Sequence, residues 1–147
     1  MIIVVADTSG LLAALDSTHP EHGTANEAIM AAGLLVMSPL LLAEFDHVAT
    51  RELGREAALS AVDHIRRWMR RGRVVVPEIT EDHLAAARSV RLRYRDLDLD
   101  LAGAVNVALA ADYDTDAILT LDRRDFRAVR PLGSQKAFRV LPDDLPL

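Results

Sequence analysis

Residues 2–15 read IIVVADTSGLLAAL, and the order of residue types in this stretch indicates the fold class. Residues 2–6 are continuously apolar and rich in β-branched side chains, which predicts a strand buried on both faces. Asp7, Thr8 and Ser9 follow, and these residue types favour helix N-termini; leucines then recur at helical spacing. A buried strand that passes directly into a helix is typical of an α/β protein with a parallel sheet.

The same alternation of strand and helix patterns continues along the chain. Further strands are predicted at residues 34–37, 74–76, 117–120 and 138–141. Helices are predicted at residues 8–15, 20–32, 39–52, 55–71, 80–94 and 101–112. Connections between parallel strands carry helices on both faces of the sheet. We therefore predict one α/β domain over residues 1–147, with three layers: a central, mostly parallel four- to five-stranded sheet flanked by helices.

The composition fits a globular domain and restricts its metal chemistry. Half of the 147 residues are hydrophobic and 27% are charged, which favours a folded chain. There is no cysteine, which excludes disulfides, thiolate metal sites and thiol nucleophiles. Carboxylates and imidazoles remain as ligands, and the former favour hard cations such as magnesium or manganese. The apolar start is too short for a signal peptide and no segment is long enough to span a membrane, so we expect a cytoplasmic protein.

The basic residues are clustered although the net charge is −5. All of them except Lys136 are arginines, and most of the arginines gather in three groups: Arg66, Arg67, Arg70, Arg71 and Arg73; Arg88, Arg91, Arg93 and Arg95; Arg123, Arg124, Arg127 and Arg130. The arginine fork matches phosphate geometry, so such patches are candidate RNA contacts. Solvated helix faces are the alternative explanation for each group.

Carboxylates follow two of the predicted strands. Asp7 comes directly after the first strand, Asp122 follows the strand at 117–120, and Asp125 lies one turn further on. In an open parallel sheet, ligands bind outside the carboxyl ends of the strands, near the point where the strand order reverses. These acids are therefore candidate site residues, although each one alone could simply cap a helix.

Glu44 is a third candidate because its position in a helix is unusual. Its neighbours at helical spacing are Leu40, Leu41 and Val48, so the carboxylate lies on or beside an apolar stripe. Glutamate is rarely found there unless it is paired or binds something. A structural ion pair is the alternative.

Three acids in one crevice would repel each other. Two carboxylates at about 5 Å cost roughly 3 kcal/mol at an effective dielectric constant of about 20. A divalent, oxygen-binding ion would neutralise them, and such an ion can activate water and hold a phosphodiester. The acids therefore predict magnesium-dependent phosphodiester hydrolysis, with manganese as a plausible alternative ion.

Four stretches of the chain resemble one family from end to end. They read VVADTSGLLAALD (4–16), SPLLLAEFDHVATR (38–51), YRDLDLDLAGAVNVALAADY (94–113) and ILTLDRRDFRAVRP (118–131). The chain resembles the PIN-domain ribonucleases, specifically the VapC toxins of type II toxin–antitoxin systems. The resemblance implies a magnesium-dependent endoribonuclease that acts on RNA, forms a homodimer and is blocked by a small cognate antitoxin protein.

The resemblance also implies roles for individual residues. Asp7, Glu44 and Asp122 are expected around the metal, with Glu44 orienting or deprotonating the attacking water and Asp125 in support. Hydroxyl and amide groups are expected to hold these carboxylates: Thr8, Ser9, Thr120 and Asn106. Arg123 and Arg124 flank the acids and are expected to contact RNA phosphates.

Gly103 departs from the family pattern, which has leucine, any residue, aspartate and alanine where this chain has Leu101-Ala102-Gly103-Ala104. A glycine inside a helix costs about 1 kcal/mol relative to alanine, and here it stands where the resemblance places a metal-binding aspartate. We therefore expect weak magnesium binding and little or no cleavage, with recovery on Gly103→Asp. The glycine is either a natural divergence or an introduced substitution; we favour the latter because active toxic ribonucleases are hard to produce.

The acids just before Gly103 do not obviously compensate. Asp100 lies one turn earlier, so its side chain would have to reach about 5 Å along the helix axis. It is expected to be a weak substitute for the missing ligand. Asp96, Asp98 and Asp100 are instead expected to be loop and cap residues that add negative potential.

Other functional classes fit less well. A phosphatase of the haloacid dehalogenase type needs a second aspartate two residues after the first, where this chain has Ser9, and a lysine at its site. A phospho-accepting receiver domain needs a lysine after a late strand, whereas the sole lysine is Lys136 near the end. A non-catalytic PIN-like domain that binds RNA or a protein is the alternative that stays open, with Gly103 in its favour.

Overall fold

Five parallel strands form the centre of the molecule in the computed structural model, which describes residues 1–147. They are β1 (Ile3–Ala6), β2 (Leu34–Val36), β3 (Val74–Val75), β4 (Ala117–Leu119) and β5 (Arg139–Leu141). Their order across the sheet is β3-β2-β1-β4-β5, and every neighbouring pair is parallel. The predicted α/β architecture is confirmed, and the sheet is entirely parallel.

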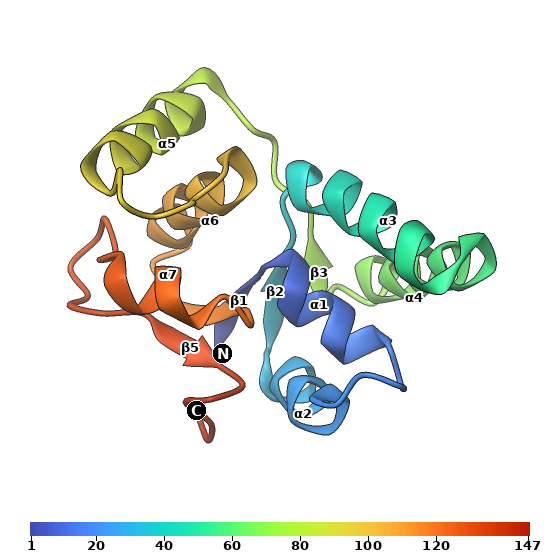
Figure 1. Ribbon diagram of the computed structural model, residues 1–147. Coiled ribbons are helices and arrows are strands. Elements are labelled where there is room, and N and C mark those ends of the chain that lie inside the picture. Colours follow the sequence, from blue (N-terminus) through green and yellow to red (C-terminus); the bar gives the residue numbers. More distant parts are fainter.

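Seven helices connect the strands (Figure 1). They are α1 (Thr8–Leu15), α2 (His22–Ala31), α3 (Pro39–Leu53), α4 (Arg55–Arg70), α5 (Glu81–Arg93), α6 (Leu101–Asp112) and α7 (Arg123–Ala128). The first six were predicted with ends that agree to within two residues. The sequence analysis missed α7, because its six residues make less than two turns and show no helical periodicity.

The helices form two layers on opposite faces of the sheet. Along β1, Val4 and Ala6 point to one face and Val5 to the other, as the alternation of side chains in a strand requires. Helices α1 to α4 pack on the first face, and α5 to α7 pack on the second (Figure 1). The domain therefore has two hydrophobic cores, separated by the sheet.

Local sequence signals fix the ends of α3. Ser38 caps the helix by accepting a hydrogen bond of 3.0 Å from the backbone N–H of Leu40, and Pro39 is its first residue. Gly54 separates α3 from α4 at a φ of 94°, which side chains rarely tolerate. The two helices consequently run together as a hairpin to one side of the sheet (Figure 1).

Gly10 allows α1 to lie directly against β4. A Cβ atom at this position would come within 2.5 Å of the carbonyl oxygen of Leu119 and 2.6 Å of its carbonyl carbon. No side chain fits at that distance, so the close approach requires glycine. This contact fixes α1, and the residues at its start, relative to the end of β4.

The point where the strand order reverses lies between β1 and β4. The chain moves from β1 outward to β2 and β3, and then returns to the other side of β1 to form β4 and β5. The backbone N–H of Asp7 donates to the carbonyl of Leu119 at 2.9 Å, so the carboxyl ends of the two central strands lie side by side. The predicted location of a ligand site is therefore present in the fold.

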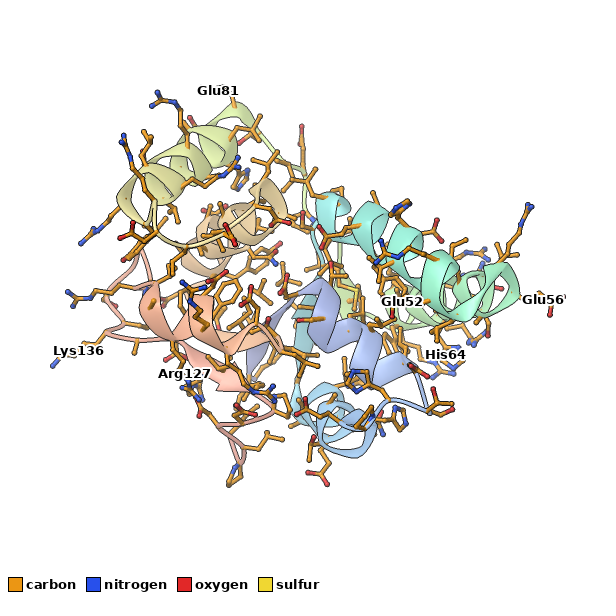
Figure 2. All side chains as sticks on the ribbon, in the orientation of Figure 1. Glu52, Glu56, His64, Glu81, Arg127 and Lys136 are labelled. Atoms are coloured by element: carbon orange, nitrogen blue, oxygen red, sulfur yellow. The ribbon has the colours of Figure 1, made fainter.

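Charged side chains cover the outside of both helical layers. Glu52, Glu56, Glu81 and Lys136 are exposed, and Figure 2 shows the last three at the periphery of the molecule. Arg127 on α7 forms an ion pair of 2.7 Å with Asp144 near the end of the chain. None of the helices combines the length and the apolar character needed to cross a membrane.

Candidate active site

An acidic cleft opens at the carboxyl ends of the central strands. It has a volume of about 310 Å³, and none of the residues that line it is basic. The lining residues come from the start of α1, from α3, from the α5–α6 loop, from α6 and from the start of α7: Asp7, Thr8, Ser9, Leu12, Glu44, Val48, Asp98, Leu99, Asp100, Gly103, Asp122 and Phe126. The fold thus brings five carboxylates from distant parts of the sequence to one cleft.

Asp7 is held by polar contacts and does not cap α1. It occupies the N-cap position, but its side chain makes no capping hydrogen bond. Instead, Thr120 donates its hydroxyl to Oδ2 at 2.8 Å, and Asn106 lies 3.4 Å from Oδ1 through its amide nitrogen. The pKa of Asp7 is raised from 3.8 to about 6, mainly by burial and to a smaller extent by the charges of Glu44 and Asp100, against the lowering effect of the Thr120 hydrogen bond. The simple capping explanation for Asp7 is therefore wrong.

The raised pKa of Asp7 predicts a pH-dependent stability in metal-free buffer. Between about pH 4 and pH 6 the folded state binds more protons than the unfolded state, so the free energy of unfolding falls as the pH rises. The shift of Asp7 from 3.8 to about 6 corresponds to at most about 3 kcal/mol. Urea denaturation in EDTA should show this fall, and Asp7→Asn should remove it and stabilise the protein at neutral pH.

The control for this experiment is Asp46→Asn, because Asp46 is an exposed acid on α3 outside the cleft. It is expected to leave the pH profile unchanged. A profile of Asp7→Asn that still falls as steeply as that of the unmodified protein would contradict the assignment of the effect to Asp7.

Glu44 points from α3 into the same cleft. It lies beside an apolar stripe, as predicted; of the three predicted members Leu41 is buried, whereas Leu40 and Val48 are only partly buried. Its Oε1 accepts a hydrogen bond of 2.5 Å from the hydroxyl of Thr8, and it takes part in none of the ion pairs of the protein. The structural ion pair considered as an alternative for Glu44 is therefore absent.

Asp122 and Asp125 occupy different environments. Asp122 is exposed, lines the cleft and makes no side-chain capping bond, although it precedes the first residue of α7. Asp125 is 5% exposed and does not line the cleft. Burial raises the pKa of Asp125, and so do its hydrogen bond with Asp122 and the charge of that neighbour. Asp125 is thus placed to contact Asp122, whereas Asp122 faces the cleft itself.

Hydroxyl groups tie the two central strand ends together. The Thr120 hydroxyl contacts Asp7 and also accepts a 2.9 Å hydrogen bond from the backbone N–H of Asp122. The hydroxyl of Ser9 accepts from the N–H of Leu121 at 2.9 Å and lies 3.3 Å from the hydroxyl of Thr120. Of the predicted supports, Thr8, Thr120 and Asn106 contact a site carboxylate directly, whereas Ser9 contacts Thr120 and the backbone of Leu121. Their role in a reaction stays a prediction.

The two arginines predicted to contact phosphate differ sharply. Arg123 lies between two acids: its guanidinium is 2.5 Å from Glu21, and its Nε is 2.6 Å from Asp143. These hydrogen bonds raise its pKa, so the charge of Arg123 is already neutralised locally. Arg124 is exposed and forms no ion pair. Neither side chain lines the cleft, and the phosphate prediction now depends mainly on Arg124.

The loop before α6 contributes residues to the cleft that the sequence analysis treated as background. Asp98, Leu99 and Asp100 all line it. Asp100 caps α6, as predicted, by accepting a 2.8 Å hydrogen bond from the backbone N–H of Gly103. The alternation of aspartate and leucine could have identified these cleft residues, because it places one acid before and one acid after the buried Leu99.

The donor atoms fit a divalent cation in kind but not in number. Carboxylate oxygens are the ligands that magnesium and manganese prefer. Position 103 offers no side chain, however, and no three acidic or histidine side chains lie close enough together to form a ready metal-binding group. The ligand set is therefore incomplete at Gly103.

Comparisons with known proteins agree on one family. Residues 4–131 match the model of the PIN domain family. Ribonuclease VapC26 of Mycobacterium tuberculosis is 36% identical over 140 residues, which cover 95% of this chain and all of that relative.

Two crystal structures have a similar fold. VapC20 of Mycobacterium tuberculosis, described as a sarcin-ricin loop cleaving toxin, superposes with a TM-score of 0.71 at 20% identity, over 82% of this chain and 90% of its own. VapBC2 of Rickettsia felis, bound to a DNA fragment from its promoter, has a TM-score of 0.67 at 13% identity. The match covers 95% of this chain and 98% of the VapBC2 chain. At these identities the two structures support the fold alone.

Proposed function

The chain belongs to the PIN-domain family, and on this basis we propose that it is a VapC-type endoribonuclease. It would be the toxin of a VapBC-type pair and would hydrolyse RNA phosphodiester bonds in the presence of Mg²⁺. The observation that carries this proposal is the convergence of Asp7, Glu44 and Asp122 on one cleft at the reversal of the strand order. The 36% identity to a ribonuclease over nearly the whole chain supports it.

In the proposed reaction, the side chains of the cleft prepare water and hold charge. Glu44 is fixed through Oε1 by Thr8, so its second oxygen is free to orient a water and accept its proton. Asp7 is kept in place by Thr120. Asp7 and Asp122 would hold the divalent cation, which when bound supplies positive charge for the phosphate and makes water more acidic.

Gly103 is expected to impair this activity. A glycine contributes no oxygen at the place where the family carries a metal-binding aspartate, so the cation is held by fewer ligands. The same feature favours the second candidate function, a PIN-like domain that binds RNA or a protein without cutting. The two functions differ in whether a carboxylate at position 103 produces cleavage.

The experiment that tests the proposed function is RNA hydrolysis by the Gly103→Asp variant. We expect it to cut single-stranded or loop RNA only when Mg²⁺ or Mn²⁺ is present and to leave 5′-phosphate ends. EDTA, or a further Asp7→Asn change, should abolish the products. A folded Gly103→Asp protein that is inert toward every RNA pool would overturn the nuclease assignment in favour of the binding domain.

Arg124 is expected to contribute to RNA affinity more than Arg123 does. Arg124→Ala removes a free, exposed cation next to the cleft, so the Kd for RNA should rise about three- to tenfold, roughly 0.6–1.4 kcal/mol. Fluorescence anisotropy with a labelled RNA measures this change in the unmodified background, where cleavage is weak. Arg55→Ala is the control, because Arg55 is an exposed, unpaired arginine on α4 outside the three arginine groups; equal effects of both variants would indicate nonspecific charge attraction.

The proposed partners follow from the same assignment. They are an RNA substrate, a cognate antitoxin protein and a second copy of the chain, and the proposed place of action is the cytoplasm. The 36% identity to Ribonuclease VapC26 supports the VapC-type assignment from which the pairing with an antitoxin is proposed. Sedimentation of the purified chain, with and without the protein encoded beside it, would measure both associations.

A further inference from the structure

We propose that Asp100 supplies the carboxylate that position 103 lacks, so that the chain binds its divalent cation through Asp100 in addition to Asp7 and Asp122. The proposal rests on the proposed function, because it concerns the metal of that same site. It assigns a ligand role to a residue one helical turn before the expected one.

The first argument is the position of the Asp100 carboxylate. Its Oδ1 lies 3.2 Å from the point where a Cβ atom of residue 103 would stand. The axial spacing of about 5 Å between successive turns made Asp100 look like a weak substitute, but that spacing applies to side chains that extend from the helix. Asp100 is the N-cap residue, and its carboxylate folds back over the first turn to reach the N–H of Gly103 at 2.8 Å.

The second argument is that Asp100 is available as a ligand. Its Oδ1 accepts the hydrogen bond from Gly103, whereas Oδ2 makes no hydrogen bond and the side chain forms no ion pair. The residue lines the cleft together with Asp7, and its charge is close enough to raise the pKa of Asp7. The capping bond also fixes the orientation of the carboxylate before a cation arrives.

The third argument is an unpaired acceptor on the same helix. Asn106 is fully buried, and its amide nitrogen lies 3.4 Å from Oδ1 of Asp7. Its own Oδ1 has no hydrogen-bond partner. A buried acceptor without a donor is costly, by roughly 1–3 kcal/mol. Asn106 therefore places an unpaired acceptor on the residue that contacts Asp7, although Asn106 itself does not line the cleft.

The space around position 103 adjoins the Asp100 carboxylate. A Cβ atom at position 103 would be tight against Oδ1 of Asp100 and would stand 2.9 Å from Cδ1 of Leu99. Both neighbours can shift by a few tenths of an ångström, so an aspartate at 103 and Asp100 would offer carboxylate oxygens to the same cation. It follows that substitutions at the two positions should not be additive.

The test is Mn²⁺ binding to the full chain, measured by electron paramagnetic resonance and by calorimetry. Asp100→Asn should weaken binding about tenfold or more, about 1.4 kcal/mol. Asparagine still caps the helix, so the fold is kept; Asp100→Ser, which also caps, serves as a second variant. Asp96→Asn is the matched control, because Asp96 belongs to the same loop but does not line the cleft.

Two further variants separate this proposal from the proposed function. In a Gly103→Asp background, Asp100→Asn should change the Mn²⁺ affinity by less than about threefold, because residue 103 then supplies the ligand. The role of Asp100 is overturned if Gly103→Asp binds Mn²⁺ tightly while Asp100→Asn alone loses no affinity. It is also overturned if only Asp98→Asn loses affinity. Either result leaves the nuclease proposal standing. An absence of Mn²⁺ binding in both Gly103→Asp and the unmodified chain overturns both.

Discussion

Replacing Gly103 by aspartate is expected to raise the rate of Mg²⁺-dependent RNA cleavage by about a hundredfold or more, roughly 3 kcal/mol of transition-state stabilisation. The new carboxylate would enter a cleft that already contains Asp7, Glu44 and Asp122. Its charge would hold the cation in a partly desolvated place, where electrostatic interactions are stronger than in water. Initial rates on one RNA substrate, measured over a range of Mg²⁺ concentrations, give the size of the effect.

The fold should tolerate this change. A Cβ atom at position 103 stands 2.9 Å from the end of the Leu99 side chain, which can move away by rotation. A side chain forced off its rotamer costs about 0.5–1.5 kcal/mol, and the removal of a glycine from the helix returns a few tenths of a kcal/mol. Thermal unfolding should therefore show only a small shift.

Gly103→Asn is the matched control for charge. Asparagine has nearly the shape of aspartate and requires the same movement of Leu99, but it brings no charge to the cation. We expect it to keep the low cleavage rate of the unmodified chain. If asparagine raised the rate as much as aspartate does, the ligand explanation for position 103 would have to be abandoned in favour of helix stabilisation.

Gly10→Ala is expected to destabilise the protein by about 3 kcal/mol or more, at the upper end of the usual cost of overpacking. The added methyl group would lie within 2.6 Å of two backbone atoms of Leu119. A side chain could rotate away, but Leu119 belongs to β4, which is paired on both sides with β1 and β5. Relief therefore requires α1 to lift from the sheet, and urea denaturation should show a lower midpoint.

Gly23→Ala provides the comparison for this second experiment. Gly23 lies in α2, and a Cβ atom there would meet nothing within 4 Å. Alanine should therefore stabilise the helix by up to about 1 kcal/mol. The two variants make the same chemical change in two helices, so opposite signs are expected. A loss of less than about 1 kcal/mol for Gly10→Ala would show that the contact between α1 and β4 is looser than described.

The sequence predicted the parts of the fold that depend on local patterns. The apolar run before Asp7 and the helical spacing after it identified β1 and α1, and similar patterns identified the other strands and the longer helices. Asp7 and Asp122 could be placed at one edge because parallel strands end on the same side. Glu44 was found because a carboxylate beside an apolar stripe is rare.

Other features depend on contacts between distant residues, which no local pattern encodes. The neutralisation of Arg123 requires Glu21 and Asp143, and neither is near it in the sequence. The turn of the Asp100 carboxylate toward Gly103 depends on the capping geometry of α6. Sequence spacing gives the distance between helix positions but not the direction of a capping side chain, so the cleft role of Asp100 had to come from coordinates.

The division of the cleft between two helical layers affects when it can form during synthesis. Glu44 comes from the layer of α1 to α4, whereas Asp100 and Gly103 come from the layer of α5 to α7. β4, which completes the central pair of strands, is made only after all of these residues. A nascent chain that has produced Asp7 and Glu44 therefore still lacks the side of the cleft that α6 and the loop before it provide. The complete cleft can therefore form only after β4 and Asp122 have been synthesised.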